Sequence, residues 1–146
     1  MSSRHYPQAP LLGAAVAIWR GDHILLAKRT AGPSIGTWAM PGGLVEIGET
    51  VTQAAIREVK EETALDIVDP LFNRLHEIIS LDEDDFVERH YVLAMFVARS
   101  DAGEAIAGDD AGAVAWFELE DLKGLHLTEH TITFAHESRK LLAALG

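Results

Sequence analysis

The sequence predicts an α+β or α/β sandwich, in which a mixed β-sheet lies between helices. Short apolar or alternating segments bounded by Gly, Pro and Asp make up most of the chain, as expected of a domain built around a sheet. Only two segments, residues 51–63 and 132–145, carry a helical pattern, and several strands separate them. With 146 residues, 48% of them apolar and 24% charged, we expect one globular domain over residues 1–146.

The first half of the chain is predicted to begin with a β-hairpin and to continue into a helix. Residues 13–19 are almost wholly apolar and predict a buried strand, residues 20–22 a turn, and residues 23–29 the returning strand. A loop rich in Gly, Pro and Ser follows at 30–36. The helix over 51–63 has Thr50 as its N-cap and contains neither glycine nor proline.

The second half is predicted to hold a hairpin, a short strand and a closing helix. Residues 71–81 and 90–99 are the two strands of the hairpin, and the acidic run 82–85 between them is interpreted as a solvated loop rather than a metal site. Residues 113–118 predict a strand, 119–125 a short helical turn, and 132–145 a helix that closes the domain.

Composition excludes several classes of function. The formal net charge of −11 argues against a nucleic-acid polymer as partner, because binding to a phosphate backbone requires a basic surface. There is no cysteine, which rules out disulfides and thiolate metal sites. No apolar run is long enough to span a membrane, and the polar start of the chain has no signal-peptide core. A cytoplasmic location is the simplest interpretation.

The most informative segment lies at residues 43–62. Positions three and four apart share one face of a helix, so Glu58, Glu61 and Glu62 are expected to project together. Three neighbouring carboxylates repel one another, and a hard cation such as Mg²⁺ or Mn²⁺, which prefers oxygen ligands, would relieve that repulsion. The spacing therefore predicts a divalent-metal site.

This segment resembles the Nudix box. The family pattern is glycine, five residues, glutamate, seven residues, Arg-Glu, an aliphatic residue, any residue, Glu-Glu, any residue, glycine and an aliphatic residue. The chain matches it at Gly43, Glu49, Arg57, Glu58, Val59, Glu61, Glu62 and Leu65. So many charged positions at fixed spacing make this a specific match.

The resemblance implies a Nudix α/β/α sandwich with a mixed central sheet. It also implies a hydrolase that uses Mg²⁺ or Mn²⁺ to cleave the pyrophosphate bond of a small nucleotide. Glu58, Glu61 and Glu62 would then bind the metal, and the Gly42 carbonyl would join them.

Two further box residues are expected to orient the site rather than to react. Arg57 offers a planar charged fork that suits a carboxylate, so an Arg57–Glu49 ion pair would orient the loop and the helix. Gly43 permits a tight turn and a close approach of the backbone.

The catalytic base is harder to assign from the sequence. Attack of water on phosphorus needs activation by a metal or by a carboxylate within hydrogen-bond reach. The loop before the last strand offers Asp110, our first choice, and Asp109, our second; Glu61 or Glu62 are the alternatives. Arg29 is a candidate for binding substrate phosphates.

Ala64 is the one departure from the box, since the pattern has glycine there. A helix commonly ends in a left-handed residue, which costs an L-amino acid about 1–2 kcal/mol. Either Ala64 accepts this strain or the chain leaves the helix in another way.

The whole chain is similar to small ADP-ribose pyrophosphatases. The similar segments are residues 38–43, 90–93 and 108–111 and Trp116. A nucleoside diphosphate derivative such as ADP-ribose is therefore the expected substrate. The alternatives are a MutT-like nucleoside triphosphate pyrophosphohydrolase and a non-catalytic, nucleotide-sensing Nudix domain. Family habit also suggests a homodimer.

Overall fold

The structure is a computed structural model that describes residues 4–30, 35–108, 111–128 and 130–145. Four strands precede the first helix, and three more strands separate it from the last two helical elements. The elements are β1 (Leu11–Arg20), β2 (His23–Arg29), β3 (Trp38–Ala39), β4 (Gly42–Leu44), α1 (Val51–Thr63), β5 (Leu71–Leu81), β6 (Val87–Arg99), β7 (Ala111–Glu118), the 3₁₀ helix η1 (Leu119–Gly124) and α2 (Thr131–Ala144).

The sheet is mixed. Its main path runs β3-β2-β1-β6-β5, with β4 paired to β1 and β7 paired to β2. β1 and β6 are parallel, in register from Leu11 opposite Tyr91 to Trp19 opposite Arg99, whereas the other pairs are antiparallel. β1 therefore lies at the centre of the sheet and contacts three other strands.

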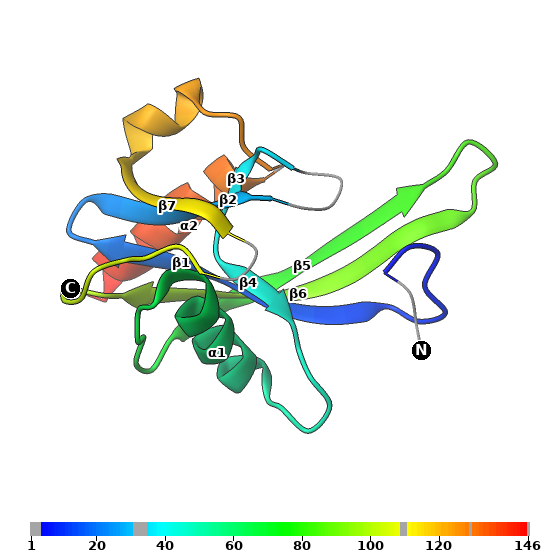
Figure 1. The fold of residues 1–146 in the computed structure, drawn as a ribbon, viewed down its shortest axis with the longest axis horizontal. Coiled ribbons are helices and arrows are strands. Elements are labelled where there is room, and N and C mark those ends of the chain that lie inside the picture. Colours follow the sequence, from blue (N-terminus) through cyan, green and yellow to red (C-terminus); the bar gives the residue numbers. More distant parts are fainter. Residues whose placement is uncertain (1–3, 31–34, 109–110, 129, 146) are drawn as a thin grey trace.

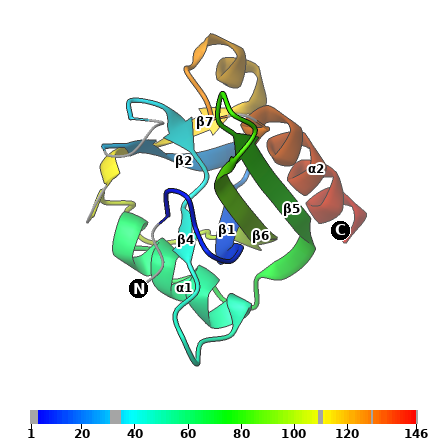
Figure 2. The same ribbon diagram turned by 90° about the vertical axis from the view of Figure 1, so that its right-hand side faces the viewer.

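The two helices cover opposite faces of this sheet (Figure 2). Alternate residues of a strand point to opposite faces, and β1 follows this rule: Val16 and Ile18 lie in the core beneath α1, while Ala17 and Trp19 lie in the core beneath α2. Because both faces are covered, β1 is apolar from Leu11 to Trp19 instead of alternating with polar residues. The architecture is the expected α/β/α sandwich with a mixed central sheet.

Most of the predicted elements are present. The strand at 23–29, the helix at 51–63 and the strand at 71–81 have the predicted bounds, whereas β1, β6 and β7 begin two or three residues earlier than predicted. The acidic run forms the hairpin turn, in which the Asp82 side chain accepts hydrogen bonds from the backbone N–H groups of Asp84 and Phe86. The short strands β3 and β4 were not predicted from the sequence.

The β5–β6 hairpin extends well beyond the end of α1 (Figure 1). We call its projecting part, residues 74–92, the arm. β5 lies at one edge of the sheet and, among the described strands, pairs only with β6. Most side chains of β5 are exposed, in contrast to the buried middle of β1.

None of the helices in residues 4–30, 35–108, 111–128 and 130–145 is long and apolar enough to cross a membrane.

Candidate active site

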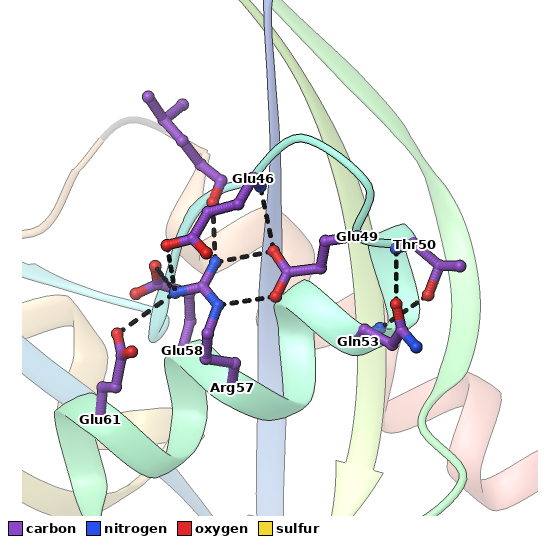
Figure 3. Close-up of polar contacts among 8 residues, drawn as sticks. Glu46, Glu49, Thr50, Gln53, Arg57, Glu58 and Glu61 are labelled. Atoms are coloured by element: carbon purple, nitrogen blue, oxygen red, sulfur yellow. Dashed lines mark hydrogen bonds and ion pairs between the residues drawn. The ribbon is translucent and has the colours of Figure 1, made fainter.

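A capping box fixes the start of α1. The Thr50 hydroxyl oxygen accepts a hydrogen bond from the Gln53 N–H at 3.0 Å, and the Gln53 side chain accepts one from the Thr50 N–H at 2.9 Å. These two bonds satisfy backbone groups that a helix start otherwise leaves without partners. The capping box sets the start of the helix and hence the positions of the acidic residues two turns later (Figure 3).

The inner face of α1 is held against the sheet by small and aliphatic side chains. Ala54, Ala55 and Val59 are fully buried in the core that also contains Val16 and Phe96. Alanine has no bulk beyond Cβ, so the helix axis can approach the sheet closely. This packing brings the carboxylates beside the buried face within reach of β4.

Glu58 and Glu62 both approach the Gly42–Gly43 backbone closely. The Glu62 Oε2 atom accepts a hydrogen bond from the Gly42 N–H at 2.9 Å. The Glu58 carboxylate occupies the space that a Cβ atom on Gly43 would need, so any larger residue at position 43 would displace it. Glycine at position 43 thus allows a close approach between the backbone and the Glu58 carboxylate.

Arg57 is the centre of a charged network between α1 and the segment that leads from β4 into the helix (Figure 3). Its Nε and Nη2 atoms donate to the two carboxylate oxygens of Glu49, at 2.7 and 2.9 Å. Its Nη2 atom also donates to the Leu44 carbonyl oxygen at 3.0 Å. The predicted Arg57–Glu49 ion pair is therefore present, and it ties the loop before α1 to the helix through a bidentate contact.

Two more acidic residues of the predicted set meet at the same guanidinium. The Arg57 Nη1 atom donates to Glu58 Oε1 at 2.8 Å and to Glu61 Oε2 at 3.2 Å, and Glu46 Oε1 lies 3.8 Å from it. Glu58 and Glu61 therefore face each other, as their spacing predicted, whereas Glu62 is turned toward Gly42. The Glu58 side chain is 15% exposed and that of Glu61 is 43% exposed.

The electrostatics of the network follow from these contacts. The hydrogen bond from Arg57 and a second one from the Glu46 N–H lower the pKa of Glu49 from 4.5 to about 2. The same ion pair raises the pKa of Arg57. One guanidinium balances only one of the four carboxylates around it, so the cluster retains a negative charge to which a cation would be attracted.

The residues present fit a divalent cation by their chemistry. Carboxylate and carbonyl oxygens are the ligands that Mg²⁺ and Mn²⁺ prefer, and Glu58, Glu62 and Gly42 supply them from two elements fixed by packing. Within the described ranges, no three acidic or histidine side chains are already arranged around a common point as ligands. The reason lies in their partners, because Glu58 and Glu61 hydrogen-bond to Arg57 and Glu62 to the Gly42 N–H.

α1 ends in the strained conformation that the sequence allowed as one alternative. Ala64 is left-handed, with φ 65° and ψ 3°, and its N–H donates to the Lys60 carbonyl oxygen. The Glu62 and Thr63 carbonyl oxygens accept hydrogen bonds from the N–H groups of Gly108 and Ile106, at 3.1 and 2.8 Å. The helix end is thus closed by the segment at 106–108, which compensates for part of the strain at Ala64.

The remaining predicted site residues are Asp109, Asp110 and Arg29. Asp109 and Asp110, our candidates for the base, are outside the described residues. They follow Gly108, where an added Cβ would overlap the Glu61 carbonyl oxygen, so the chain leaves the end of α1 at very close range. Arg29 lies at the exposed end of β2, opposite Ala111 of β7.

A surface depression of about 400 Å³ lies elsewhere, between η1 and α2. None of its lining residues carries a carboxylate, and none belongs to the segment 43–65. We therefore place the candidate active site at α1 and β4, where the oxygen ligands are, rather than in this depression.

Comparison with known proteins shows the family to which the chain belongs. The family model described as NUDIX domain matches residues 9–144. An ADP-ribose pyrophosphatase of Methanocaldococcus jannaschii is 38% identical over 80% of this chain; the match spans 66% of that protein, just under two thirds of its length. The chain therefore belongs to the NUDIX family and is a Nudix hydrolase.

Solved structures give the same result. The crystal structure of a MutT NUDIX hydrolase from Burkholderia pseudomallei has a TM-score of 0.78 and 30% identity, and the match covers 89% of this chain and 98% of that one. A bifunctional NMN adenylyltransferase/ADP ribose pyrophosphatase from Francisella tularensis, complexed with AMP and a Mn ion, has a TM-score of 0.67 and 25% identity. That match covers 94% of this chain and 42% of the larger protein.

Sequence reasoning missed three contributors to the site. The Thr50-x-x-Gln53 spacing was readable as a capping box, but only the cap itself was predicted. The role of Gly108 depends on a contact with the end of α1 that no local pattern shows. Glu46 approaches Arg57 only because the loop before α1 folds back on itself, with the Glu46 N–H donating to Glu49 Oε1 at 3.0 Å.

Proposed function

We propose that this protein is a divalent-metal-dependent hydrolase that cleaves the pyrophosphate bond of a nucleoside diphosphate derivative related to ADP-ribose. One observation carries the proposal: the carboxylates of Glu58 and Glu62 are held against the Gly42–Gly43 backbone by the packing of α1 on the sheet. In this proposal residues 1–146 act as one domain, in the cytoplasm, on a small nucleotide.

Glu58, Glu62 and the Gly42 carbonyl oxygen would hold the cation, which is Mg²⁺ or Mn²⁺. The N–H and C=O groups of one strand residue point to the same side, so the Gly42 carbonyl is directed, like its N–H, toward the helix. Glu61 would complete the set, directly or through water. When bound, the ion supplies a Lewis acid and lowers the pKa of a bound water.

The remaining residues would hold the metal ligands in position or accept the proton of the attacking water. Arg57 holds Glu49 and Glu58 in fixed orientations, which keeps the ligand set from having to reorganise during turnover. A carboxylate accepts the proton of the attacking water; Asp110 is our first choice, and Asp109, Glu61 and Glu62 are the alternatives. Arg29 would contact a substrate phosphate from the loop side.

The overall reaction would be hydrolysis of the pyrophosphate bond. Water adds to one phosphorus atom, and the bond from that phosphorus to the bridging oxygen breaks. The bridging oxygen leaves with the second phosphoryl group. The products are a nucleoside monophosphate and the phosphorylated remainder, or pyrophosphate when the substrate is a triphosphate.

The choice of substrate rests on the archaeal relative, which is an ADP-ribose pyrophosphatase 38% identical to this chain. A MutT-like action on nucleoside triphosphates is the second candidate. It is favoured by the similarity to the MutT NUDIX hydrolase, which extends over 98% of that chain.

A turnover assay tests the proposal. ADP-ribose, NADH, nucleotide sugars, dinucleoside polyphosphates and nucleoside triphosphates are each incubated with Mg²⁺, Mn²⁺ or EDTA, and the phosphate released after coupling to a phosphatase is measured. We expect ADP-ribose to be cleaved fastest and EDTA to abolish cleavage. Preference for triphosphates would support the MutT-like alternative, and nucleotide binding without any turnover would support the sensing alternative.

A further inference from the structure

The segment that joins β6 to β7 passes along the C-terminal end of α1 (Figure 1). Glu61 and Glu62, two of the proposed metal ligands, lie in the last turn of this helix. The carbonyl groups of a last turn have no partner within the helix, so the turn frays unless other groups bind them. Ligands on a frayed turn would have no fixed position, and a precise metal site therefore needs this turn to be closed.

The segment before β7 closes the turn through its backbone. The Gly108 N–H donates to the Glu62 carbonyl oxygen at 3.1 Å, and the Ile106 N–H donates to the Thr63 carbonyl oxygen at 2.8 Å. Because α1 ends at Thr63, these two bonds satisfy the last two carbonyl groups of the helix. The end of α1 is thus completed by residues more than 40 positions later in the chain.

Packing fixes the same contact from the side of the helix. Thr63 is fully buried, and its hydroxyl donates to the Val59 carbonyl oxygen at 2.7 Å and accepts a hydrogen bond from the Leu65 N–H at 3.2 Å. Ala105 of the opposing segment packs against the core beneath α1, of which Leu65 is a buried member. The helix end and the segment are therefore held together by side chains as well as by backbone hydrogen bonds.

Gly108 allows the segment to lie directly against the last turn. A Cβ atom at this position would overlap the carbonyl oxygen of Glu61, which is a backbone atom and cannot rotate aside. A residue with a side chain would therefore push the segment away from the helix and break the hydrogen bond from position 108 to the Glu62 carbonyl. The absence of a side chain at Gly108 is what permits the closure.

We propose that Gly108 is a positioning residue of this hydrolase. Glu62 is held at both ends by glycine N–H groups, its carboxylate by Gly42 at 2.9 Å and its carbonyl by Gly108 at 3.1 Å. Gly108 contacts neither the cation nor the substrate; it fixes the backbone from which Glu61 and Glu62 reach the cation. The inference rests on the proposed function, because it takes these two carboxylates to be metal ligands.

The closure can be measured in the parent protein. If a closed last turn favours cation binding, cation binding must favour the closed turn by the same factor. Exchange of a hydrogen-bonded amide requires local opening, so saturating Mg²⁺ should slow exchange at the Ile106 and Gly108 N–H groups by about tenfold or more. The control is the Phe86 N–H in the turn of the arm, which donates to Asp82 at 3.0 Å and should be unaffected.

Gly108→Ala tests the contact directly. Titration with Mn²⁺, followed by electron paramagnetic resonance, should give a dissociation constant about 10–100-fold above that of the parent, as for other groups that support metal ligands. The matched control is Gly112→Ala. Its added Cβ would meet the Thr30 Cγ2 atom at 2.7 Å but, among the described residues, no atom of α1 within 4 Å, so it should bind Mn²⁺ like the parent.

Two results would overturn this inference while leaving the proposed function intact. One is a folded Gly108→Ala variant that binds Mn²⁺ as tightly as Gly112→Ala, although Glu62→Gln binds it weakly. The other is a parent protein that binds Mg²⁺ without any slowing of exchange at Ile106 and Gly108, and this result decides the matter if circular dichroism shows Gly108→Ala to be unfolded. A parent that neither bound the cation nor cleaved a nucleotide would overturn the proposed function as well.

Discussion

On the α1 side of the sheet, the two ends differ in the chemistry and exposure of their side chains. At α1 and β4, charged groups are crowded together, and almost every one has a partner: Arg57 with Glu49, Glu58 with Arg57, Glu62 with the Gly42 N–H. Along the arm, apolar groups are spread out and exposed, and a strand edge is open. We propose that the first region binds a small cation and a substrate, whereas the edge strand of the second region pairs, among the described residues, only with β6.

The two regions should respond differently to single mutations. The site at α1 and β4 depends on close approach, so a single added methyl group or a single neutralised carboxylate should disable it. None of these close contacts involves the arm, so single changes there should leave catalysis intact. A change at the site can therefore be compared with a matched change elsewhere in the chain.

The largest effect is expected for Glu62→Gln. The new amide oxygen can still accept the hydrogen bond from the Gly42 N–H, so the fold is kept, but one ligand charge is lost. Changes in groups that merely support metal ligands cost about 10–100-fold, so we expect turnover to fall by at least the upper end of that range. Steady-state kinetics on purified protein measures it.

The control for Glu62→Gln lies on the arm. Glu83→Gln removes the same charge from the exposed hairpin turn and should leave turnover unchanged. If both variants were as active as the parent, Glu62 would not be a ligand.

The next largest effect is expected for Gly43→Ala. The added Cβ would occupy the place of the Glu58 carboxylate and push it away from the backbone of β4. Turnover should fall by about 10–100-fold, as for other changes that displace a metal ligand, and the metal concentration needed for half-maximal rate should rise.

Gly124→Ala is the matched control, because a Cβ there meets no other atom within 4 Å. Equal turnover in the two alanine variants would contradict the close approach of Glu58 to Gly43.

A smaller effect, on stability alone, is expected for Ala64→Gly. Glycine removes the cost of a left-handed alanine, about 1–2 kcal/mol, but it also adds about 0.5–1 kcal/mol of backbone entropy to the unfolded chain. The free energy of unfolding in urea should therefore rise by roughly 0.5–1 kcal/mol, with turnover unchanged.

The arm offers a comparison for Ala64→Gly. Asp85 has the same φ of 65° in the hairpin turn, but aspartate tolerates this conformation better than alanine does. Asp85→Gly should therefore gain less, and an equal or larger gain would show that strain is not what distinguishes Ala64.

The smallest effect concerns acid stability. The pKa of Glu49 is lowered from 4.5 to about 2, first by the hydrogen bond from Arg57. The folded protein therefore binds this proton less readily than the unfolded chain, so the contribution of Glu49 is fully present above pH 4.5 and is lost as the pH falls toward 2. Glu49→Gln should be less stable than the parent at neutral pH, and the difference should shrink across this window.

Urea unfolding at a series of pH values measures this difference. The arm again supplies a counterpart, since the Tyr6 hydroxyl lowers the pKa of Asp82 in the same direction, and Asp82→Asn should show a difference of the same sign. A gap between the parent and Glu49→Gln that stays constant with pH would contradict the assigned ion pair.

The sequence predicted which charged residues lie near one another on α1 better than it predicted the short strands of the sheet, and the reason is physical. Glu58, Glu61 and Arg57 lie on one helix, so their spacing alone places them near one another, and the box pattern adds Glu49. The strands β3 and β4 are two and three residues long, too short for any alternation to show, and they exist because β1 and β2 supply the hydrogen bonds.

Tertiary contacts account for the remaining features that the sequence did not predict. The contact between the Glu62 carboxylate and the Gly42 N–H of β4 was not predicted from the sequence. The exposure of Leu75 and Ile79 could not be foreseen either. An apolar position in a strand predicts burial, and only the length of the hairpin relative to α1 shows that these two positions project beyond the core.

Metal binding is the measurement that tests the central claim most directly. Free Mn²⁺ is followed by electron paramagnetic resonance while parent, Glu58→Gln, Glu62→Gln and Glu83→Gln proteins are titrated. We predict that the parent and Glu83→Gln bind the ion with equal affinity and that Glu58→Gln and Glu62→Gln bind it much more weakly. Equal binding by all four proteins would contradict the account, because the cation would then be held somewhere other than at α1 and β4.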